Sequence, residues 1–265
     1  MSSIQKQGKA LITGASTGIG AIYADRLAKR GYDLILVARD EAKLNGVADK
    51  IKADHAVNVT VISADLTLKE ELARIESILR ADSSITLLVN NAGLGAVTKL
   101  AESNIDDIET MISLNVIALT RLSAAITPGL ITSGHGAIIN IASIVALAPE
   151  LLNGAYSGSK AYVVNFTQSM HLELADKGIR VQAVLPGAID TPFWDKSGLP
   201  VNHLPAQIVM NPEALVDAAL AGFDMGEVIT IPSLPDLNDW HVLESARKAL
   251  APNLSHTTPA SRYLS

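Results

Sequence analysis

The sequence predicts an α/β fold in which a seven-stranded parallel sheet lies between two layers of helices, as a doubly wound three-layer sandwich. Three observations support this prediction. Strand and helix patterns alternate along the chain, the first strand runs directly into a glycine-rich turn and a helix, and the 265 residues contain no internal repeat or linker. Because parallel strands need long crossover connections, usually helices, such alternation favours a sheet covered on both faces. We expect one domain over residues 1–265.

The seven expected strands are short apolar runs. They lie before Gly14 and at residues 33–38, 57–63, 87–90, 137–141, 180–184 and 227–231. The expected helices occupy residues 21–30, 40–53, 67–81, 105–127, 155–176 and 239–250, with another that begins at residues 211–212.

Several helix ends carry recognisable signals. Asp40 is an expected N-cap, and Thr67 with Glu70 has the spacing of a capping box. Pro128 and the glycine after it are expected to end the helix at residues 105–127, because proline cannot donate the next helical hydrogen bond. Gly178 is an expected C′ glycine, and Asn211 precedes a proline in the first turn of a helix.

Composition excludes several classes of function. The net charge of −6 comes from interspersed acidic and basic residues, so no basic face is available for nucleic acid. The chain has no cysteine, which excludes disulfides and thiolate metal sites, and no metal is expected. Residues 1–8 lack the apolar stretch of a signal peptide. We expect no apolar run long enough to span a bilayer, since polar residues and a proline interrupt even the long apolar region at 137–152. We therefore expect a soluble cytoplasmic protein that does not enter a membrane.

The first glycine-rich turn has the spacing Gly14-x-x-x-Gly18-x-Gly20. A strand that turns sharply into a helix N-terminus directs unpaired backbone N–H groups and the positive end of the helix dipole to one place. Gly14 and Gly18 would let the backbone approach a pyrophosphate, and Gly20 would let the helix pack close to the sheet. The pattern predicts a Rossmann-type dinucleotide site; a plain strand–helix connection is the alternative.

A second group of residues indicates acid–base chemistry. Tyr156 and Lys160 are four residues apart and share one helix face, where an ammonium would favour the phenolate and lower the tyrosine pKa. Ser143 follows the fifth strand, and its hydroxyl could hold a carbonyl oxygen beside the phenol. Asn115 lies among apolar residues inside a long helix, where asparagine is a mediocre helix former.

At these positions the chain resembles the short-chain dehydrogenase/reductase family in its compact form. The matching pieces occur in the family's order over residues 9–191. They are Thr13-Gly14-x-x-x-Gly18-x-Gly20, Asp65, Asn90-Asn91-Ala92-Gly93, Asn115, Ser143, Tyr156-x-x-x-Lys160, Pro186-Gly187 and Thr191. Two positions depart from the family's pattern: Thr17 stands where many NADP-dependent relatives carry Arg or Lys, and Gly158 stands where alanine is frequent.

The resemblance implies an NAD(P)-dependent oxidoreductase that interconverts a ketone or aldehyde and an alcohol by hydride transfer. Tyr156 would be the general acid/base, Ser143 would bind the substrate oxygen, and Lys160 would lower the tyrosine pKa and hold the nicotinamide ribose. Asn115 would keep a water molecule in a proton relay to Lys160. The expected cofactor-binding residues are Gly14, Ser16, Thr17, Gly18, Ile19, Gly20, Arg39, Asp65, Leu66, Asn91, Ala92, Gly93, Tyr156, Lys160, Pro186, Gly187, Ile189 and Thr191.

The end of the second strand favours NADP over NAD as cofactor. An acidic side chain there would bind both ribose hydroxyls of NAD and repel a 2′-phosphate, but this chain has Ala38. Arg39, the next residue, could bind a 2′-phosphate with charge-assisted hydrogen bonds. Alternatively Arg39 faces solvent and Asp40 only caps the next helix. NAD therefore stays possible.

We expect residues 191–211 to form a substrate-loop insert. The apolar residues in and near this insert predict the kind of substrate. Those in the insert are Phe193, Trp194, Leu199, Val201, Leu204, Ile208, Val209 and Met210. Others follow the fourth and fifth strands, namely Leu94, Ile144, Val145, Leu147, Leu151 and Leu152. Together they indicate an apolar pocket under a movable lid, suited to a small ketone or secondary alcohol with hydrocarbon bulk.

The resemblance also suggests a homotetramer or homodimer, formed by pairing the apolar helices at 105–127 and 155–176 across a two-fold axis. Two other functions stay open. A nucleotide-sugar epimerase or dehydratase uses a related Tyr–Lys pair, and a cofactor-sensing protein would bind the dinucleotide without turnover.

Overall fold

The computed structural model describes residues 7–194 and 200–264. Leu199 of the expected apolar insert and residues 1–6 of the N-terminal segment lie outside these ranges. The chain divides into two compact units, one that ends at Pro232 and one that begins at Ser233. The single domain expected over residues 1–265 remains a prediction.

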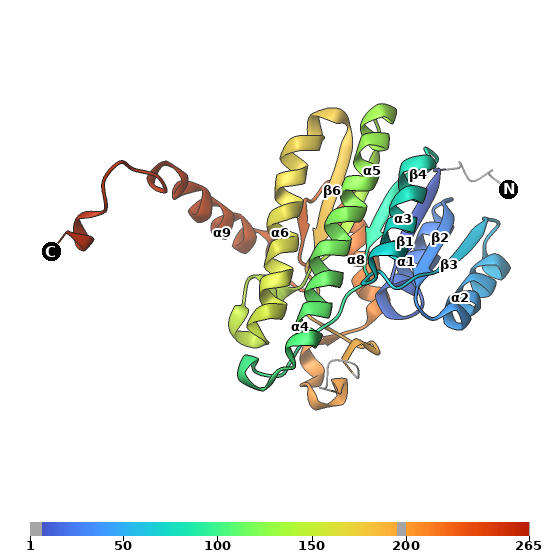
Figure 1. Ribbon diagram of the computed structural model, residues 1–265, viewed down its shortest axis with the longest axis horizontal. Helices are drawn as coiled ribbons and strands as arrows, with labels where there is room; N and C mark the ends of the chain where they lie inside the picture. The colour runs from blue at the N-terminus through green and yellow to red at the C-terminus, as the bar shows by residue number, and fades with distance from the viewer. Residues whose placement is uncertain (1–6, 195–199, 265) are drawn as a thin grey trace. The chain divides into compact units, whose positions relative to one another are not determined.

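The first unit is built on a seven-stranded sheet in the order β3-β2-β1-β4-β5-β6-β9 (Figure 1). Every neighbouring pair is parallel. The strands are β1 (Lys9–Thr13), β2 (Asp33–Ala38), β3 (Val59–Ser63), β4 (Ile85–Asn90), β5 (Gly136–Ile141), β6 (Ile179–Val184) and β9 (Ile229–Thr230). The direction of winding reverses between β1 and β4, and ligands of such sheets bind outside the carboxyl ends of the strands at this point.

Helices cover both faces of the sheet, which confirms the predicted doubly wound sandwich. Alternate strand residues point to opposite faces, so Ala10 and Ile12 join one apolar core while Leu11 joins the other. The first core is completed by α1 (Gly18–Lys29), α2 (Glu41–Asp54) and α8 (Pro212–Asp224). The second is completed by α3 (Lys69–Ala81), α5 (Leu119–Ser133) and α6 (Gly154–Leu174).

The long helix does not end before Pro128. It runs as α4 (Ile105–Ile112), a π-helical segment (Ser113–Ala118) and α5, with Pro128 inside α5. The expected end at residue 127 is wrong because buried Ile126 and Leu130 pack in the second core on both sides of the proline. Packing against the sheet therefore outweighs the hydrogen bond that the proline removes. The helix ends before Gly134, which adopts the left-handed conformation at φ 69°.

One helical stretch of the described residues, Ile105–Ser133, is long and apolar enough to cross a membrane by length and composition. The expectation that no run reaches this length is therefore wrong, because α4, the π segment and α5 are continuous. In its most apolar 18-residue stretch, 44% of the residues are buried inside the unit. Helix α5 forms part of the second core there.

Other helix boundaries test the predicted caps. Asp40 accepts a hydrogen bond from the Lys43 backbone, Asn211 caps α8, and Gly178 is left-handed at φ 75°, as expected. The predicted capping box at Thr67 is wrong, since α3 begins at Lys69 and Leu68 occupies the N-cap position. The Thr67 hydroxyl instead donates to Asp65 Oδ1 at 2.7 Å, and this short turn at the end of β3 delays the start of the helix.

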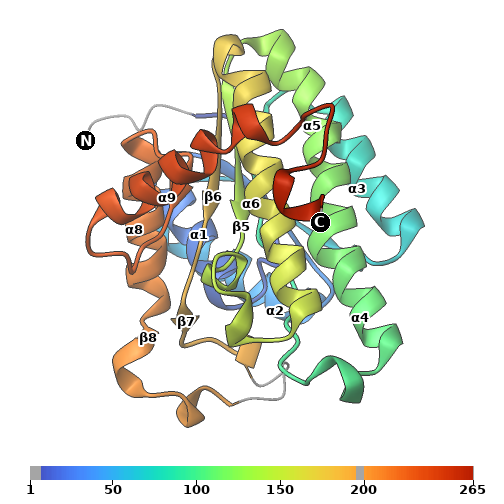
Figure 2. The same ribbon diagram turned by 90° about the vertical axis from the view of Figure 1, so that its left-hand side faces the viewer.

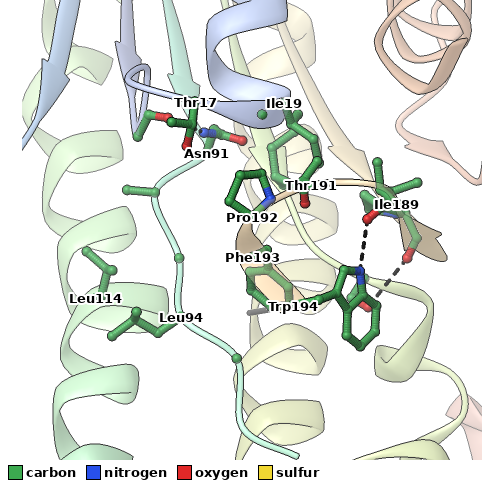
Figure 3. Close-up of a pocket in the computed structure, with 18 of the residues that line it drawn as sticks. Thr17, Ile19, Asn91, Leu94, Leu114, Ile189, Thr191, Pro192, Phe193 and Trp194 are labelled. Atoms are coloured by element: carbon green, nitrogen blue, oxygen red, sulfur yellow. Dashed lines mark hydrogen bonds between the residues drawn. The ribbon is translucent and has the colours of Figure 1, made fainter. Parts of the chain in front are cut away.

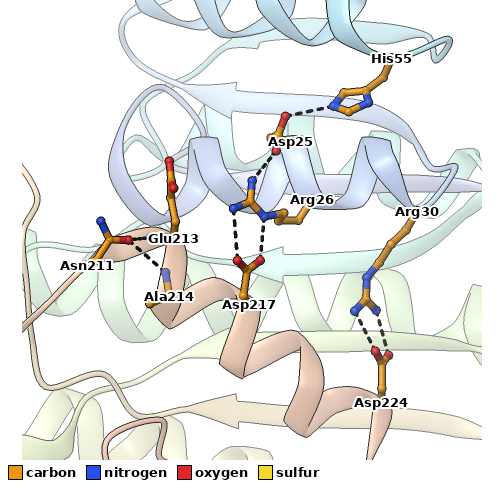
Figure 4. A network of polar contacts seen from close by, with 9 residues as sticks. All are labelled: Asp25, Arg26, Arg30, His55, Asn211, Glu213, Ala214, Asp217 and Asp224. Atoms are coloured by element: carbon orange, nitrogen blue, oxygen red, sulfur yellow. Dashed lines mark hydrogen bonds and ion pairs between the residues drawn. The ribbon is translucent and has the colours of Figure 1, made fainter.

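Helices α1 and α8 are joined by ion pairs on the surface of the first unit (Figure 4). Arg26 Nε donates to Asp217 Oδ1 at 2.7 Å, and Arg30 pairs with both oxygens of Asp224 at 2.8 Å. Arg26 also donates to Asp25, whose other oxygen lies 3.0 Å from His55 Nε2. Single exposed pairs contribute little, but bidentate arginine pairs fix the geometry of the two helices.

The two ends of the expected insert are held together by a second, small sheet. Strand β7 (Ala188–Ile189) pairs in parallel with β8 (Val209–Met210), as Figure 2 shows. Between them the described residues form two short 3₁₀ turns, Val201–His203 and Ala206–Ile208. The segment is thus anchored at both ends.

The second unit consists of α9 (Leu237–Ala249) and two 3₁₀ turns, Ala251–Asn253 and Ser261–Tyr263. Asp236 caps α9 by accepting a hydrogen bond from the Asn238 backbone at 2.9 Å. None of its described residues, 233–264, is buried.

Candidate active site

A cavity of about 630 Å³ opens at the carboxyl ends of the parallel strands. Most of the predicted site residues line it, although they come from segments far apart in the sequence. They are Gly14, Ser16, Thr17, Gly18, Ile19, Arg39, Asp65, Leu66, Asn91, Ala92, Gly93, Ser143, Tyr156, Lys160, Pro186, Gly187, Ile189 and Thr191. Two predicted residues, Gly20 and Asn115, lie behind the cavity wall.

The glycine turn lines the cavity between the ends of β2 and β4, because β1 lies between these two strands in the sheet. Gly14 and Gly18 adopt φ values of 66° and 56°, which side chains rarely tolerate. A Cβ atom at Gly20 would lie 2.4 Å from the Gly14 carbonyl oxygen, so α1 packs directly against the turn. Gly18 begins α1 at the cavity wall, and a Cβ atom placed on it would lie 3.3 Å from Thr191 Cγ2. These residues fit a dinucleotide pyrophosphate at the helix N-terminus.

Asn91 braces this turn from the neighbouring strand. Its side-chain Nδ2 donates to the carbonyl oxygens of Thr13 and Gly14 at 2.9 and 3.1 Å. The Thr13 hydroxyl in turn accepts hydrogen bonds from the backbone N–H groups of Asn91 and Ala92, both at 3.0 Å. The ends of β1 and β4 are therefore fixed relative to each other.

Asn90 directly precedes Asn91, and its side chain is buried in the core. Its Nδ2 donates to Ser123 Oγ at 3.0 Å and to Asn140 Oδ1 at 2.9 Å. Asn140 Nδ2 donates to Thr167 Oγ1, which ties α6 to β5. This buried network joins the two strands and the two helices that carry the rest of the site.

Arg39 and Asp65 lie side by side at one end of the dinucleotide-sized cavity, after β2 and β3. Arg39 Nη1 is 3.7 Å from Asp65 Oδ2, and the arginine side chain is 60% exposed. Burial would raise the pKa of Asp65, but hydrogen bonds from Thr67 and the charge of Arg39 hold it below its usual value. Lys43, on the first turn of α2, lines the same end. Two cations thus face this part of the cavity.

Tyr156 lies in the first turn of α6, which Asn153 caps through a hydrogen bond from the Ala155 backbone. Burial raises the pKa of Tyr156 to about 12, and a hydrogen bond with the Ser143 side chain acts in the opposite direction. The Ser143 hydroxyl lies 3.4 Å from the Pro186 carbonyl oxygen. The predicted serine–tyrosine pair is therefore assembled at the cavity wall.

Lys160 lies one helical turn after Tyr156 and is buried. Its Nζ donates to the Ile141 carbonyl oxygen at 2.9 Å and is 5.9 Å from the centre of the Tyr156 ring. Burial lowers the pKa of Lys160 to about 8. The family resemblance implies that Lys160 lowers the tyrosine pKa; in this structure burial of the phenol dominates and the shift of Tyr156 is upward.

Asn115 lies in the π-helical segment and supports the cavity wall from behind. Its Oδ1 accepts from the Leu94 backbone at 2.9 Å, and its Nδ2 donates to the Leu94 carbonyl oxygen at 2.8 Å and to Ser159 Oγ at 3.1 Å. Ser159 then donates to the Tyr156 carbonyl oxygen at 2.7 Å. Through this chain Asn115 connects the segment after β4 to the helix of Tyr156. Extra residues in π segments commonly mark functional sites.

The apolar part of the cavity lies beside Tyr156. Ile108, Met111 and Val145 form a buried cluster with Tyr156, and Leu94, Leu152 and Phe193 pack against it. Figure 3 shows Phe193 and Trp194 on the segment after β7, opposite Leu94 and Leu114. The predicted apolar lining is therefore present in part. The predicted residues that line the cavity are Leu94, Ile144, Val145, Leu151, Leu152, Phe193, Trp194, Leu204 and Ile208, whereas Leu147, Val201, Val209 and Met210 do not line it.

Sequence reasoning missed two lining residues of chemical interest. Lys43 could have been found from its position in the sequence, although the indication is weak. It lies three residues after the N-cap Asp40, in the first turn of α2, which begins at the cavity. Nothing in the sequence near Gly95 indicated its role, because the side chain that requires a glycine there, Phe193, is distant in the sequence.

A glycine turn and a Ser–Tyr–Lys group that line one dinucleotide-sized cavity define the class of Rossmann-type oxidoreductases. The family model described as short chain dehydrogenase matches residues 8–200. The chain therefore belongs to the short-chain dehydrogenase/reductase family.

Curated relatives agree with this family. An uncharacterized oxidoreductase of Staphylococcus saprophyticus is 38% identical over 185 residues, which are 69% of this chain and 79% of the relative. The very-long-chain 3-oxoacyl-CoA reductase of Bos taurus is 33% identical over 198 residues, which are 71% of this chain and 63% of that protein.

Solved structures are more similar still. A short-chain dehydrogenase from Sphingobium yanoikuyae in complex with NADPH has a TM-score of 0.94 and 45% identity, covering 97% of this chain and 99% of that one. A bulky-bulky ketone specific alcohol dehydrogenase from Comamonas testosteroni has a TM-score of 0.91 and 42% identity, covering 98% and 100%. In the described residues no group of three or more histidine, aspartate or glutamate side chains could hold a metal ion.

Proposed function

We propose that the protein is an NADP-preferring carbonyl reductase or alcohol dehydrogenase that interconverts apolar ketones and secondary alcohols. The observation that carries this proposal is the convergence of Ser143, Tyr156 and Lys160 on the cavity that the glycine turn also lines. Members of the family supply hydride from a nicotinamide cofactor, so the chain itself must align the substrate and move a proton.

Each of the three side chains has a distinct part in this chemistry. With a pKa of about 12, Tyr156 is protonated at neutral pH and donates its phenolic proton to the substrate oxygen during reduction. Ser143 donates a hydrogen bond to the same oxygen. Lys160, charged below pH 8, stabilises the phenolate that forms and binds a ribose hydroxyl. Asn115 positions the helix of Tyr156 and holds a relay water near Lys160.

The cofactor would lie along the cavity from Arg39 to Tyr156. The pyrophosphate would meet the α1 N-terminus at Gly18, and Asp65 would accept a hydrogen bond from the adenine. Arg39 and Lys43 favour a 2′-phosphate and hence NADP. The NADPH bound to the Sphingobium yanoikuyae dehydrogenase, 45% identical to this chain, supports this choice.

The substrate class follows from the apolar wall beside Tyr156. Leu94, Val145, Leu152 and Phe193 would bury hydrocarbon groups on the carbonyl carbon. The similarity to the Comamonas testosteroni enzyme, described as a bulky-bulky ketone specific alcohol dehydrogenase, supports a ketone of this kind.

The test is initial-rate measurement with the purified protein on a panel of aldehydes, cyclic ketones, aryl ketones and diketones, with NADPH and with NADH. We expect NADPH-dependent reduction of apolar ketones. Absence of cofactor oxidation on the whole panel would contradict the proposal. Cofactor binding without turnover would then favour a sensing protein, and conversion of a nucleotide sugar without net cofactor oxidation would favour an epimerase.

We also infer a homotetramer or homodimer, since apolar side chains on α4–α5 and α6, such as Ile117 and Leu172, are exposed in the single chain. A cytoplasmic location and the absence of nucleic-acid and membrane partners remain predictions.

A further inference from the structure

Gly95 and Phe193 lie in contact although almost a hundred residues separate them. Gly95 belongs to the segment after β4, and Phe193 to the segment after β7. A Cβ atom placed on Gly95 would lie 2.4 Å from Phe193 Cζ, 3.0 Å from Cε1 and 3.3 Å from Cε2. The tip of the ring therefore occupies the space that any side chain at residue 95 would need.

The ring of Phe193 is held on its other sides. The next residue, Trp194, is 8% exposed, and its Nε1 donates to the Ile189 carbonyl oxygen at 2.9 Å. The two rings meet edge to face, with centroids 5.8 Å apart at 89°. This anchor restricts the backbone of Phe193, so its ring can move mainly by rotation about its own side-chain bonds.

Phe193 also faces the candidate catalytic tyrosine. The ring centroids of Phe193 and Tyr156 are 6.2 Å apart, and both residues line the same cavity. Phe193 thus lies between the Gly95 backbone and the space beside the Tyr156 phenol, where a substrate carbonyl would bind.

We infer that Gly95 and Phe193 together set the size of the substrate group accepted beside Tyr156. Because residue 95 has no side chain, the Phe193 ring lies back against the main chain and leaves space at the phenol. This inference rests on the proposed ketone reduction and adds the pair of residues that limits substrate size.

The contact permits a specific perturbation. Gly95 does not have a positive φ, so alanine imposes no backbone strain there. The three atoms nearest to its methyl group would all belong to the Phe193 ring. Gly95→Ala should therefore displace the ring, and with the backbone held at Trp194 we expect it to move into the cavity. Phe193→Ala removes the ring and should remove this effect.

The experiment compares kcat/KM for acetophenone and for 1-phenylbutan-1-one in the parent protein, Gly95→Ala, Phe193→Ala and the double variant. One or two methylene groups commonly change kcat/KM by about tenfold or more in a tight pocket. We expect Gly95→Ala to lower the ratio of the longer to the shorter ketone by about tenfold, and Phe193→Ala to raise it. In the double variant the ratio should equal that of Phe193→Ala, because the methyl group no longer meets a ring.

Gly46→Ala is the matched control, since a Cβ there meets no atom within 4 Å, and it should leave the ratio unchanged. The affinity for NADPH, measured by fluorescence titration, should be the same in all variants. An equal loss on both ketones in Gly95→Ala, or the same loss in the Phe193→Ala background, would overturn the inference.

A crystal structure of Gly95→Ala provides a readout that does not depend on activity. The Phe193 ring should be displaced toward Tyr156, and a ring at its original position would also overturn the inference. Failure of the proposed function has a different signature, since the parent protein would then reduce neither ketone.

Discussion

Lys160 Nζ lies 5.9 Å from the centre of the Tyr156 ring and donates a hydrogen bond to the Ile141 carbonyl oxygen at 2.9 Å. Both side chains are buried on the same face of α6. Burial disfavours the charged form of each, so it raises the pKa of the phenol to about 12 and lowers that of the ammonium to about 8. Near neutral pH the pair therefore holds a protonated phenol beside a charged lysine.

This arrangement predicts opposite pH dependences for the two directions. Reduction needs the protonated phenol and the charged lysine, so its kcat should be highest below about pH 8 and fall as Lys160 loses its proton. Oxidation needs the phenolate and should become faster as the pH rises. Initial rates between about pH 6 and 10 measure both. A reduction rate that increases through pH 8 would contradict the assignment of Lys160.

Tyr156→Phe should remove most turnover and leave the fold intact. The variant keeps the aromatic ring, which packs with Val145 and Phe193, but removes the group that moves the proton. We expect kcat to fall by at least about 10²-fold, the usual scale for a lost acid–base group. The NADPH dissociation constant and the circular dichroism spectrum should stay near those of the parent. Near-normal kcat would show that another group moves the proton.

Lys160→Ala should impair both turnover and cofactor affinity, because we assign the ammonium to the phenolate and to the ribose. The measurements are kcat on a good ketone and the NADPH dissociation constant by fluorescence. Lys177→Ala is the matched control, since it removes an exposed lysine that pairs with Asp176 just after α6. If Lys160→Ala changed kcat but not cofactor affinity, the ribose contact would be wrong.

Arg39→Ala should reduce the preference for NADPH. One charge-assisted contact to a 2′-phosphate contributes about 1.5–3 kcal/mol, which corresponds to about 10- to 100-fold in kcat/KM. We expect the ratio of kcat/KM with NADPH to that with NADH, at low salt, to fall by this factor. Lys50→Ala removes an exposed charge of α2 that does not line the cavity, and should leave the ratio unchanged.

Equal kcat/KM values for NADPH and NADH in the parent protein would contradict the assignment of Arg39 to a 2′-phosphate. An unchanged ratio of kcat/KM with NADPH to that with NADH in Arg39→Ala would contradict it too. Lys43→Ala then tests whether Lys43 alone binds the phosphate, because the same ratio would fall in that variant.

Light scattering should give a mass of two or four chains rather than the 27.9 kDa of one. Leu172, 82% exposed on α6, is expected at the contact between copies, so Leu172→Glu should lower the measured mass. Leu68→Glu places the same charge at a 50% exposed leucine outside the two helices and should not. A monomer at micromolar concentration in the parent protein would refute the predicted assembly.

The sequence predicted most of the sheet because its signals are local. Residues 33–38 of β2 were predicted with their exact bounds, since a buried parallel strand is a continuous apolar run. Asp40, Asn211 and Gly178 were recognised because caps depend on the conformation of a few neighbouring residues. Tyr156 and Lys160 were paired by the helical period alone.

Tertiary packing decided what local signals could not. Pro128 stays inside a helix because the apolar residues around it are buried against the sheet, and Thr67 bonds to Asp65 instead of capping α3. The upward pKa shift of Tyr156 comes from burial by many segments together.

The sequence by itself determined the order of the strands along the chain, the glycine turn and the chemical identity of the Ser–Tyr–Lys group. Only the tertiary structure decided which distant residues meet. Arg39 reaches Asp65 because β2 and β3 are neighbours in the sheet, and Gly95 meets Phe193 because the segments after β4 and β7 border one cavity. The physical reason is that backbone preferences act over a few residues, whereas contacts depend on how apolar surfaces pack in space.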